Sequence, residues 1–306
     1  MIVLGFDTAT QASAVGLRLS DGRTLRASDD PAAGEHPGHA TRLLAMAREL
    51  LVQADVRWDE LDRIAVGVGP GRFTGLRVGI ATARGLAQSV GAQLVGVSSL
   101  RALALAATRE AREMDARETG ETHESETRET RESDRTPPPG TIAVIDARRG
   151  ESFIAAYPPT ADFAALAGAA PGADLQACGG EIAFERALRP DELSGVVAQI
   201  EQRGAAPGQR WRAVGDGALL YADALRDGGV ELAPADSPLH LIDGAAVCEL
   251  AAAVPAAVLR GALEPVLPDY RRSPDAALAR RAASRPAPAG QVPAASTPGP
   301  VSRART

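Results

Sequence analysis

The chain contains no lysine, only two cysteines and no long apolar run, and each absence excludes a class of protein. Without lysine it has no Walker A phosphate loop, which requires Gly-Lys-Ser/Thr. Cys178 and Cys248 stand alone, so we expect neither a disulfide framework nor a CxxC metal site. No stretch approaches a membrane span, and the N-terminus lacks the basic leader of a signal peptide. We therefore expect a soluble, cytoplasmic protein with no membrane partner.

The chain does have enough apolar sequence for a substantial core. It has 306 residues, 45% of them hydrophobic, which can bury one large core or two modest ones. All 33 basic residues are arginine, but 39 acidic residues outnumber them and the net charge is −6. No overall positive field therefore points to direct binding of nucleic acid.

The most informative stretch is Ile64–Leu86. Its first five residues form a β-branched apolar run that predicts a buried strand. The sequence Gly-Pro-Gly at residues 69–71 then predicts a turn, and a helix is expected from Arg72. Small residues recur at every fourth position of that helix: Gly71, Gly75, Gly79, Ala83 and Ala87. Each glycine inside a helix costs about 1 kcal/mol relative to alanine, so this row requires a reason.

Three interpretations of the glycine row remain open from the residues alone. The row can pack closely inside its own domain, it can let a partner helix approach, or its N-terminal turn can bind an anion. It is not a dinucleotide fingerprint, because its glycines have the wrong offsets. The substitution Gly75→Leu separates the first two interpretations. It would abolish partner binding and leave the chain folded if the row is a docking surface, whereas unfolding would favour internal packing.

The order of predicted elements indicates an α/β fold. Residues 2–6, 14–19 and 24–27 read as a strand followed by a hairpin, and 40–54 as an amphipathic helix. Its apolar stripe comprises Leu43, Leu44, Ala47, Leu50 and Leu51. The strand at 64–68, the glycine-row helix, a strand at 93–97 and a helix to about 108 complete the first half. Strands that alternate with helices predict a mixed sheet flanked by helices.

The second half begins like the first. Residues 142–146 again form an apolar run that ends in aspartate, and a turn leads to a strand at 152–157. We interpret this echo as two related subdomains around a cleft. Later elements are expected as helices at 181–188, 193–200 and 241–254, and a strand at 211–214 followed by a helix through 225.

Two segments do not read as folded sequence. Residues 109–135 hold ten acidic and six arginine residues without an apolar stripe, so we expect disorder or a loose solvated helix. Beyond residue 273, proline, alanine and arginine dominate, which predicts a disordered tail. The expected organisation is a first subdomain at 1–108, a charged insertion at 109–140, a second subdomain at 141–272 and a tail at 273–306.

No catalytic or metal-binding constellation emerges. His36 and His39 lie near Glu35, which would suit a metallopeptidase, but the intervening Pro-Gly prevents a shared helical face and no third ligand is evident. The two carboxylates at strand ends, Asp7 and Asp146, either form a phosphate or metal site or satisfy turns. We expect no catalytic residue and no metal site.

The motifs of this chain resemble those of the TsaB family. The resemblance rests on Gly-Pro-Gly-Arg-Phe-Thr-Gly-Leu-Arg-Val-Gly at 69–79, Ile-Asp-Ala-Arg-Arg-Gly-Glu at 145–151 and the Pro-x-Tyr segment within 264–272. It implies two actin-like, ribonuclease H-like (ASKHA) subdomains, the second degenerate. It also implies a non-catalytic subunit that binds and activates the TsaD transferase during threonylcarbamoyladenosine synthesis on tRNA. The charged insertion is not part of this resemblance.

The resemblance further implies partners and site residues. The partners are a TsaD-like paralogue, a TsaE-like ATPase, tRNA through the complex only, and a second copy of this chain when the paralogue is absent. No cofactor is expected in this chain, although ATP or ADP can lie at the partner interface. The implied interface residues are Gly71, Phe73, Thr74, Gly75, Gly79, Ala83, Leu43 and Ala47. The implied vestigial nucleotide site comprises Asp7, Thr8, Thr10, Asp146, Gly215 and Gly217.

One alternative from another class stays open, namely an autonomous actin-like small-molecule kinase or ATPase. It would use Asp7 and Asp146. Arg148 and Arg149 stand where an active enzyme of this superfold would have a Gly/Thr-rich phosphate loop, and they argue against it.

Overall fold

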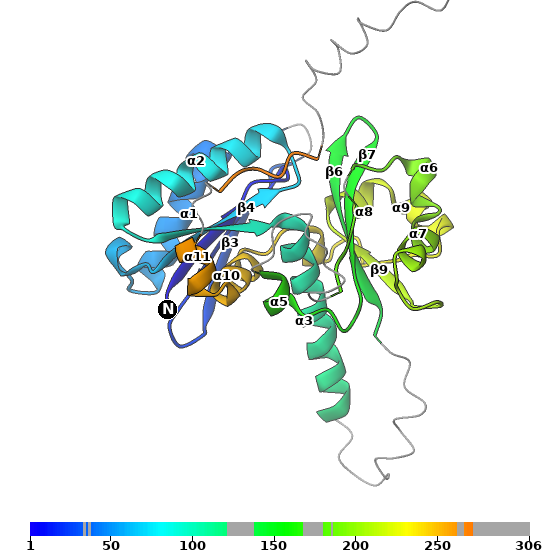
Figure 1. Cartoon of the computed structure of the whole chain (residues 1–306). Coiled ribbons are helices and arrows are strands. Elements are labelled where there is room, and N and C mark those ends of the chain that lie inside the picture. The colour runs from blue at the N-terminus through cyan, green and yellow to red at the C-terminus, as the bar shows by residue number, and fades with distance from the viewer. Residues whose placement is uncertain are drawn as a thin grey trace, which may run out of the picture. The chain divides into compact units, whose positions relative to one another are not determined.

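Two five-stranded sheets with the same strand order frame the molecule, a computed structural model that describes residues 1–32, 35, 38–120, 138–167, 180–184, 186–261 and 266–271 (Figure 1). The first sheet has the order β3-β2-β1-β4-β5 and the second β8-β7-β6-β9-β10. In the first sheet β1 is antiparallel to β2 and parallel to β4, and in the second sheet β6 is likewise antiparallel to β7 and parallel to β9. The predicted α/β class and the repetition of one topology in both halves are confirmed.

The strands follow the β-branched and apolar runs of the sequence. Their bounds are β1 (Val3–Asp7), β2 (Ser13–Arg18), β3 (Thr24–Asp29), β4 (Arg63–Gly69), β5 (Gln93–Ser98), β6 (Gly140–Arg148), β7 (Glu151–Tyr157), β8 (Ile182–Ala183), β9 (Trp211–Val214) and β10 (Glu231–Leu232). The helices are α1 (His39–Gln53), η1 (Trp58–Glu60), α2 (Phe73–Val90), α3 (Ser99–Gly120), α5 (Phe163–Ala167), α6 (Pro190–Leu193), α7 (Val196–Gln202), α8 (Asp216–Leu220), α9 (Ala222–Asp227), η3 (Pro238–His240), α10 (Gly244–Ala253) and α11 (Ala256–Gly261).

Alternate side chains of the first sheet enter two different cores. Leu4 and Phe6 pack with the apolar stripes of α1 and α2, whereas Val3 joins a cluster that contains α3, α10 and residues of the second sheet. This period of two is the geometry of a strand that is buried on both faces. The second sheet is covered on its other face by α6 to α9.

The helix α10 lies directly on the first hairpin. A Cβ at Gly16 would stand 2.2 Å from the carbonyl oxygen of Gly244, so only glycine at both positions permits this approach. Arg63 in β4 reaches the other end of α10, where its Nη1 donates to the carbonyl oxygens of Ala251 (2.5 Å) and Val254 (2.9 Å). A helix that is late in the sequence is thereby fixed to the first sheet.

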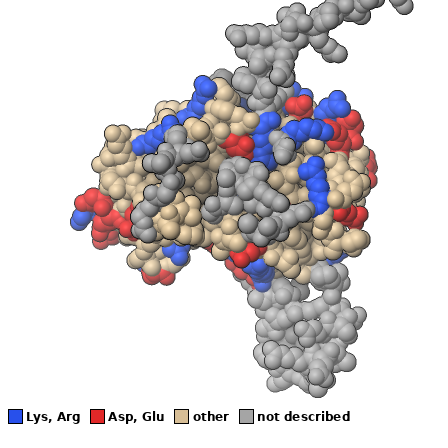
Figure 2. Space-filling view, in the orientation of Figure 1, with Lys and Arg blue, Asp and Glu red and all other residues tan. Residues whose placement is uncertain are grey.

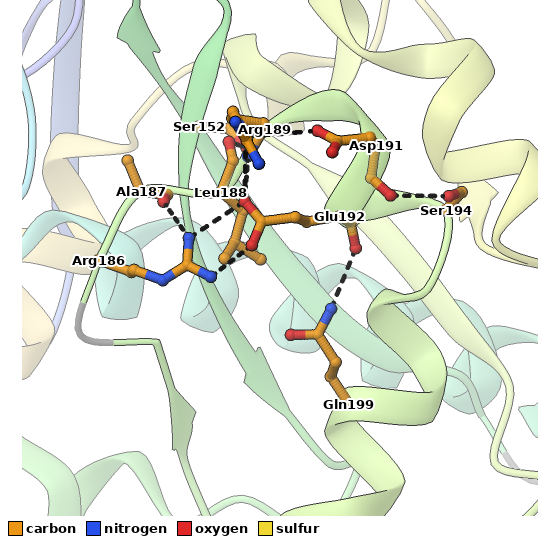
Figure 3. A network of polar contacts seen from close by, with 9 residues as sticks. All are labelled: Ser152, Arg186, Ala187, Leu188, Arg189, Asp191, Glu192, Ser194 and Gln199. Atoms are coloured by element: carbon orange, nitrogen blue, oxygen red, sulfur yellow. Dashed lines mark hydrogen bonds and ion pairs between the residues drawn. The ribbon is translucent and has the colours of Figure 1, made fainter. Parts of the chain in front are cut away.

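A polar network joins β7 to the segment that leads into α6 (Figure 3). Leu188 exchanges two backbone hydrogen bonds with Ser152, each of 2.8 Å. Glu192 accepts from the backbone N–H of Arg189 and from the guanidinium of Arg186, and these contacts lower the pKa of Glu192 to about 2. The network caps the short helix α6, which is a structural role.

Three sequence predictions were wrong in detail. Residues 181–188 are not a helix, because Ile182 and Ala183 pair with β7 instead. The expected helix after β9 is two short helices, α8 and α9. The third helix extends to Gly120 rather than 108, and Arg109 forms an ion pair with Asp243 at the N-cap of α10. The rest of the predicted insertion (121–137) and the tail lie outside the described residues.

Candidate functional site

The carboxylate of Asp7, expected at a nucleotide site, is turned into the protein. It is 1% exposed, and its two oxygens accept from the backbone N–H of Ala9 and the hydroxyl of Ser99, both at 2.6 Å. Burial raises the pKa of Asp7 above its ordinary value, although these hydrogen bonds act in the opposite direction. A Cβ at Gly67 would lie 1.8 Å from Asp7 Oδ2. Asp7 therefore ties the β1–β2 turn to the start of α3, as the turn interpretation predicts.

The two threonines of the same turn are also internal. Thr8 is fully buried, and its hydroxyl donates to the carbonyl oxygen of Gly75 at 2.7 Å. Thr10 is 5% exposed and donates to the carbonyl oxygen of Ala12 at 3.4 Å. Both hydroxyls stabilise the turn and its contact with α2.

The corresponding turn of the second half brings two carboxylates together. The backbone N–H of Asp146 donates to Asp216 Oδ1 at 3.1 Å. Asp146 itself accepts from the backbone N–H of Arg148 at 2.8 Å and forms an ion pair with the Arg148 guanidinium at 3.5 Å. Burial raises the pKa of Asp216 to about 6, and the charge of Asp146 adds to the rise. The Arg148 side chain provides a charge partner for Asp146 in this turn.

The glycines beside Asp216 pack closely against β6. A Cβ at Gly215 would lie 2.2 Å from the carbonyl oxygen of Val144, and one at Gly217 would lie 2.8 Å from the Val144 side chain. These glycines let α8 pack against β6. Gly215 and Gly217 therefore have a packing role here, and Asp7 has one in the first half. The nucleotide site stays a prediction.

Arg72 links the two turns electrostatically. It precedes α2, and its guanidinium lies 3.4 Å from the Gln11 side chain. Burial lowers the pKa of Arg72, as does the nearby Arg148, while Asp146 and Asp216 oppose that shift. The structure thus places the first-half residue Arg72 near the second-half carboxylates, but it does not place Asp7 among them.

The glycine row packs against the interior of its own chain. A Cβ at Gly75 would lie 2.0 Å from the carbonyl oxygen of Thr8, and one at Gly71 would lie 2.4 Å from that of Ala9. The row is therefore filled by the β1–β2 turn. Five residues of the expected interface are buried in this way or in the core of the first sheet: Gly75, Gly79, Ala83, Leu43 and Ala47.

Other residues of α1 and α2 are exposed to solvent. Phe73 is 42% exposed, and Thr74 next to it is also exposed, as expected for the interface. On α1, Leu44 and Val52 are 44% and 71% exposed. Leu44 was wrongly expected on the buried stripe. Its i+8 relation to Val52 is the sequence signal for a second apolar row on the outer face.

The histidine interpretation finds no support among the described residues. His39 is 6% exposed, its Nδ1 lies 2.7 Å from the Ser13 hydroxyl, and burial lowers its pKa. His36 lies outside the described residues. Within the described ranges, no group of three or more His, Cys, Asp or Glu side chains is arranged to hold a metal ion. None of the helices searched over the same ranges is both long and apolar enough to cross a membrane.

The sequence is similar to those of known proteins. The family model of TsaD, tRNA N6-adenosine threonylcarbamoyltransferase, matches residues 35–120. The chain is 29% identical over 241 residues to the tRNA threonylcarbamoyladenosine biosynthesis protein TsaB of Escherichia coli, covering 79% of this chain and 85% of that protein. It is 34% identical over 156 residues to an uncharacterized protein of Mycobacterium leprae, of which the match spans only 35%.

A solved structure extends the similarity to the fold. YeaZ from Pseudomonas aeruginosa superimposes with a TM-score of 0.56 at 27% sequence identity, and the match covers 87% of this chain and 98% of that one. A second Pseudomonas aeruginosa structure, of a protein with similarity to peptidase YEAZ, gives a TM-score of 0.57 with 89% and 99% coverage. In sequence and in fold, the chain is thus TsaB-like (YeaZ-like) over most of its length, which confirms the family resemblance of its glycine-rich motif.

Proposed function

We propose that this chain is a non-catalytic subunit that binds and activates a TsaD-like transferase in the synthesis of threonylcarbamoyladenosine in tRNA, at the adenosine next to the anticodon. The carrying observation is the TsaD match to residues 35–120, which contain α1, α2 and most of α3. The chain therefore shares these elements with its proposed partner. Related chains often associate through equivalent surfaces, as in a two-fold dimer.

The exposed outer face of α1 and α2 is the surface that we propose for this contact. It presents Leu44, Val52 and Thr74. Burial of exposed apolar side chains stabilises an interface by roughly 25 cal/mol per Å². The glycine row contributes to this surface indirectly, because its close packing against the β1–β2 turn fixes the position of α2.

The internal position of the expected nucleotide residues supports a non-catalytic role. Both oxygens of Asp7 are engaged by protein donors, and the Asp146 carboxylate is engaged by Arg148. The alternative, an autonomous kinase or ATPase, would need at least one of these carboxylates to face its substrate. We expect the isolated chain to show no ATP turnover above a buffer blank, and measurable turnover would revive the alternative.

The remaining partners follow from the same proposal. A TsaE-like ATPase would join the assembled pair, and ATP or ADP would bind where the two related chains meet. In the absence of the paralogue, the outer face of α1 and α2 would pair with a second copy of this chain.

Light scattering coupled to size-exclusion chromatography tests the scaffold proposal. The chain is measured alone and mixed with the TsaD-like protein from its own organism. We expect a stable mixed complex that forms at the expense of any homodimer. Leu44→Glu should prevent the complex, since it would bury a charge in the interface. Leu220→Glu, at a 60% exposed leucine of α8, is the matched control and should leave the complex intact.

Two outcomes would contradict the proposal. Separate elution of the two wild-type proteins with and without ATP would exclude a scaffold. Equal binding by both leucine variants would exclude the outer face of α1 and α2. Thermal unfolding of each variant must match the wild type, because both positions are exposed.

A further inference from the structure

A short segment near the end of the described chain runs along α2. This C-terminal strap (Val266–Arg271) appears in orange beside the cyan helix in Figure 1. Its Asp269 backbone N–H donates to the carbonyl oxygen of Val68 at 2.7 Å. Arg84 of α2 donates to the carbonyl oxygen of Val266. The strap is therefore anchored at one point to β4 of the first sheet and at another to α2.

The strap places an exposed tyrosine on an aromatic support. The rings of Tyr270 and Phe73 are stacked with centroids 5.1 Å apart, and both side chains are more than 40% exposed. The Arg77 guanidinium carbon lies 3.8 Å from the Phe73 ring centroid, and its Nε donates to the Tyr270 hydroxyl at 3.0 Å. Phe73 thus supports one face of the Tyr270 ring and Arg77 binds its hydroxyl, while the rest of the ring faces outward.

The charge around this cluster is positive. Within the described residues, neither Arg77 nor Arg84 forms an ion pair, whereas the nearby Asp269 is paired with Arg271 at 2.9 Å. Figure 2 shows basic side chains along the upper edge of the face where Figure 1 draws α2 and the strap. Two arginines thus contact the strap on a chain whose overall charge is −6.

We propose that Tyr270, Phe73, Arg77 and Arg84 form a surface that binds single-stranded RNA. A base stacks on the outer face of Tyr270, and Arg77 and Arg84 contact the adjacent phosphates. A preorganised aromatic ring beside arginines that form no ion pair within the described residues is the combination that recognises a planar base on a polyanionic backbone. An acidic peptide would use the charge but would leave the ring unused. The inference rests on the proposed function, which makes an RNA the substrate of the complex.

Fluorescence anisotropy with a labelled oligoadenylate of about twelve nucleotides tests the surface on the full chain, at low salt. Tyr270→Leu should weaken binding about tenfold, because one stacked base contributes an effect of that order. Tyr270→Phe keeps the ring and should bind within about twofold of the wild type. Arg77→Gln should weaken binding and make the logarithmic salt dependence shallower by about one phosphate contact. Arg48→Gln, an equal change of charge on α1, is the matched control.

The outcomes separate this inference from the proposed function. Equal binding by Tyr270→Leu and wild type would overturn it, as would equal losses from Arg77→Gln and Arg48→Gln. Should Tyr270→Leu unfold by circular dichroism, the comparison of Arg77→Gln with Arg48→Gln decides alone.

The same variants are mixed with the TsaD-like partner. If they lose the complex but retain RNA binding, the surface is a protein interface and the inference is wrong. If the complex forms and no variant or wild type binds RNA, the inference fails while the scaffold stands.

Discussion

At the scale of single residues, glycine 75 shows how tightly the chain packs on itself. Its carbonyl oxygen accepts from Thr8, and a Cβ on it would lie 2.0 Å from the Thr8 carbonyl oxygen. Thr8 and Gly75 are thus joined by a hydrogen bond, and they lie so close that a methyl group on residue 75 would clash with the Thr8 backbone. The contact joins α2 to the β1–β2 turn.

We predict that Gly75→Ala lowers the free energy of unfolding by about 3 kcal/mol, because the added methyl must displace backbone rather than a flexible side chain. Gly85→Ala in the same helix meets no atom within 4 Å and should stabilise the chain by about 0.5–1 kcal/mol. Urea denaturation of both variants measures the difference. Equal stabilities would mean that the row does not pack internally. The substitution Gly75→Leu is accordingly expected to unfold the chain rather than only to block a partner.

Asp216 predicts a pH dependence of stability. Burial raises its pKa in the folded chain from 3.8 to about 6, so the folded state retains a proton that the unfolded chain has already released. The stability from this group is therefore full below pH 3.8 and is lost as the pH rises to about 6.

We predict that Asp216→Asn increases the free energy of unfolding at pH 7 by up to about 3 kcal/mol and changes it little near pH 4. The amide keeps an oxygen that can accept the hydrogen bond from Asp146. Asp223→Asn, at a 99% exposed side chain on α9, should change stability at neither pH. Urea unfolding at the two pH values measures the effect. A constant difference between Asp216→Asn and wild type would show that Asp216 is not protonated in the folded state.

At the scale of elements, Arg63 connects a strand of the first sheet with the last turn of α10. The final carbonyl groups of a helix have no partner within it, and a positive charge there also interacts favourably with the helix dipole. Arg63 supplies both effects through Nη1, although burial lowers its pKa.

We predict that Arg63→Met destabilises the chain by about 2 kcal/mol, since it leaves two buried carbonyl groups without their donor while keeping a side chain of similar length. Arg57→Met is the control, because the Arg57 side chain is 72% exposed and its ion pair with Asp59 lies at the surface. Thermal unfolding followed by circular dichroism compares the two. If both variants unfold at the same temperature, the Arg63 contacts contribute nothing to stability.

At the scale of the whole molecule, one apolar cluster joins the two sheets. It contains residues of β1, β4 and β5, of α3 and α10, and of β6 and β7. Residues 1–271 accordingly form one compact unit. The proposed division at 108 and 141 remains a prediction. The contacts show, however, that α10 and the C-terminal strap pack on the first sheet although they follow the second in sequence.

The two proposed surfaces both use α2. The partner surface uses Thr74 of α2 together with α1, and the RNA surface uses Phe73, Arg77 and Arg84 of α2 together with the C-terminal strap. A subunit that holds one partner and one segment of the substrate would position the two relative to each other. This arrangement requires no catalytic group in the chain itself.

The sequence by itself determined the local elements and the class of fold. Its apolar runs, turn residues and period-two alternation identify β1, β4, β6 and β9 to within about two residues, because local propensity and burial act together there. The repeated strand that ends in aspartate predicted the common topology of the two halves. The 69–79 motif predicted the family resemblance.

Only the tertiary structure decided which groups the glycine row and the individual side chains contact. Small residues permit close approach without specifying what approaches, so the glycine row fits a partner helix or the chain's own turn equally well in sequence. Asp7 meets Ser99, and Arg63 meets Ala251, across long separations that no local period encodes. Phe73 meets Tyr270 in the same way. Such contacts depend on how the sheets and helices pack, and that packing buried Asp7, Thr8 and Thr10 and brought the aromatic pair to the surface.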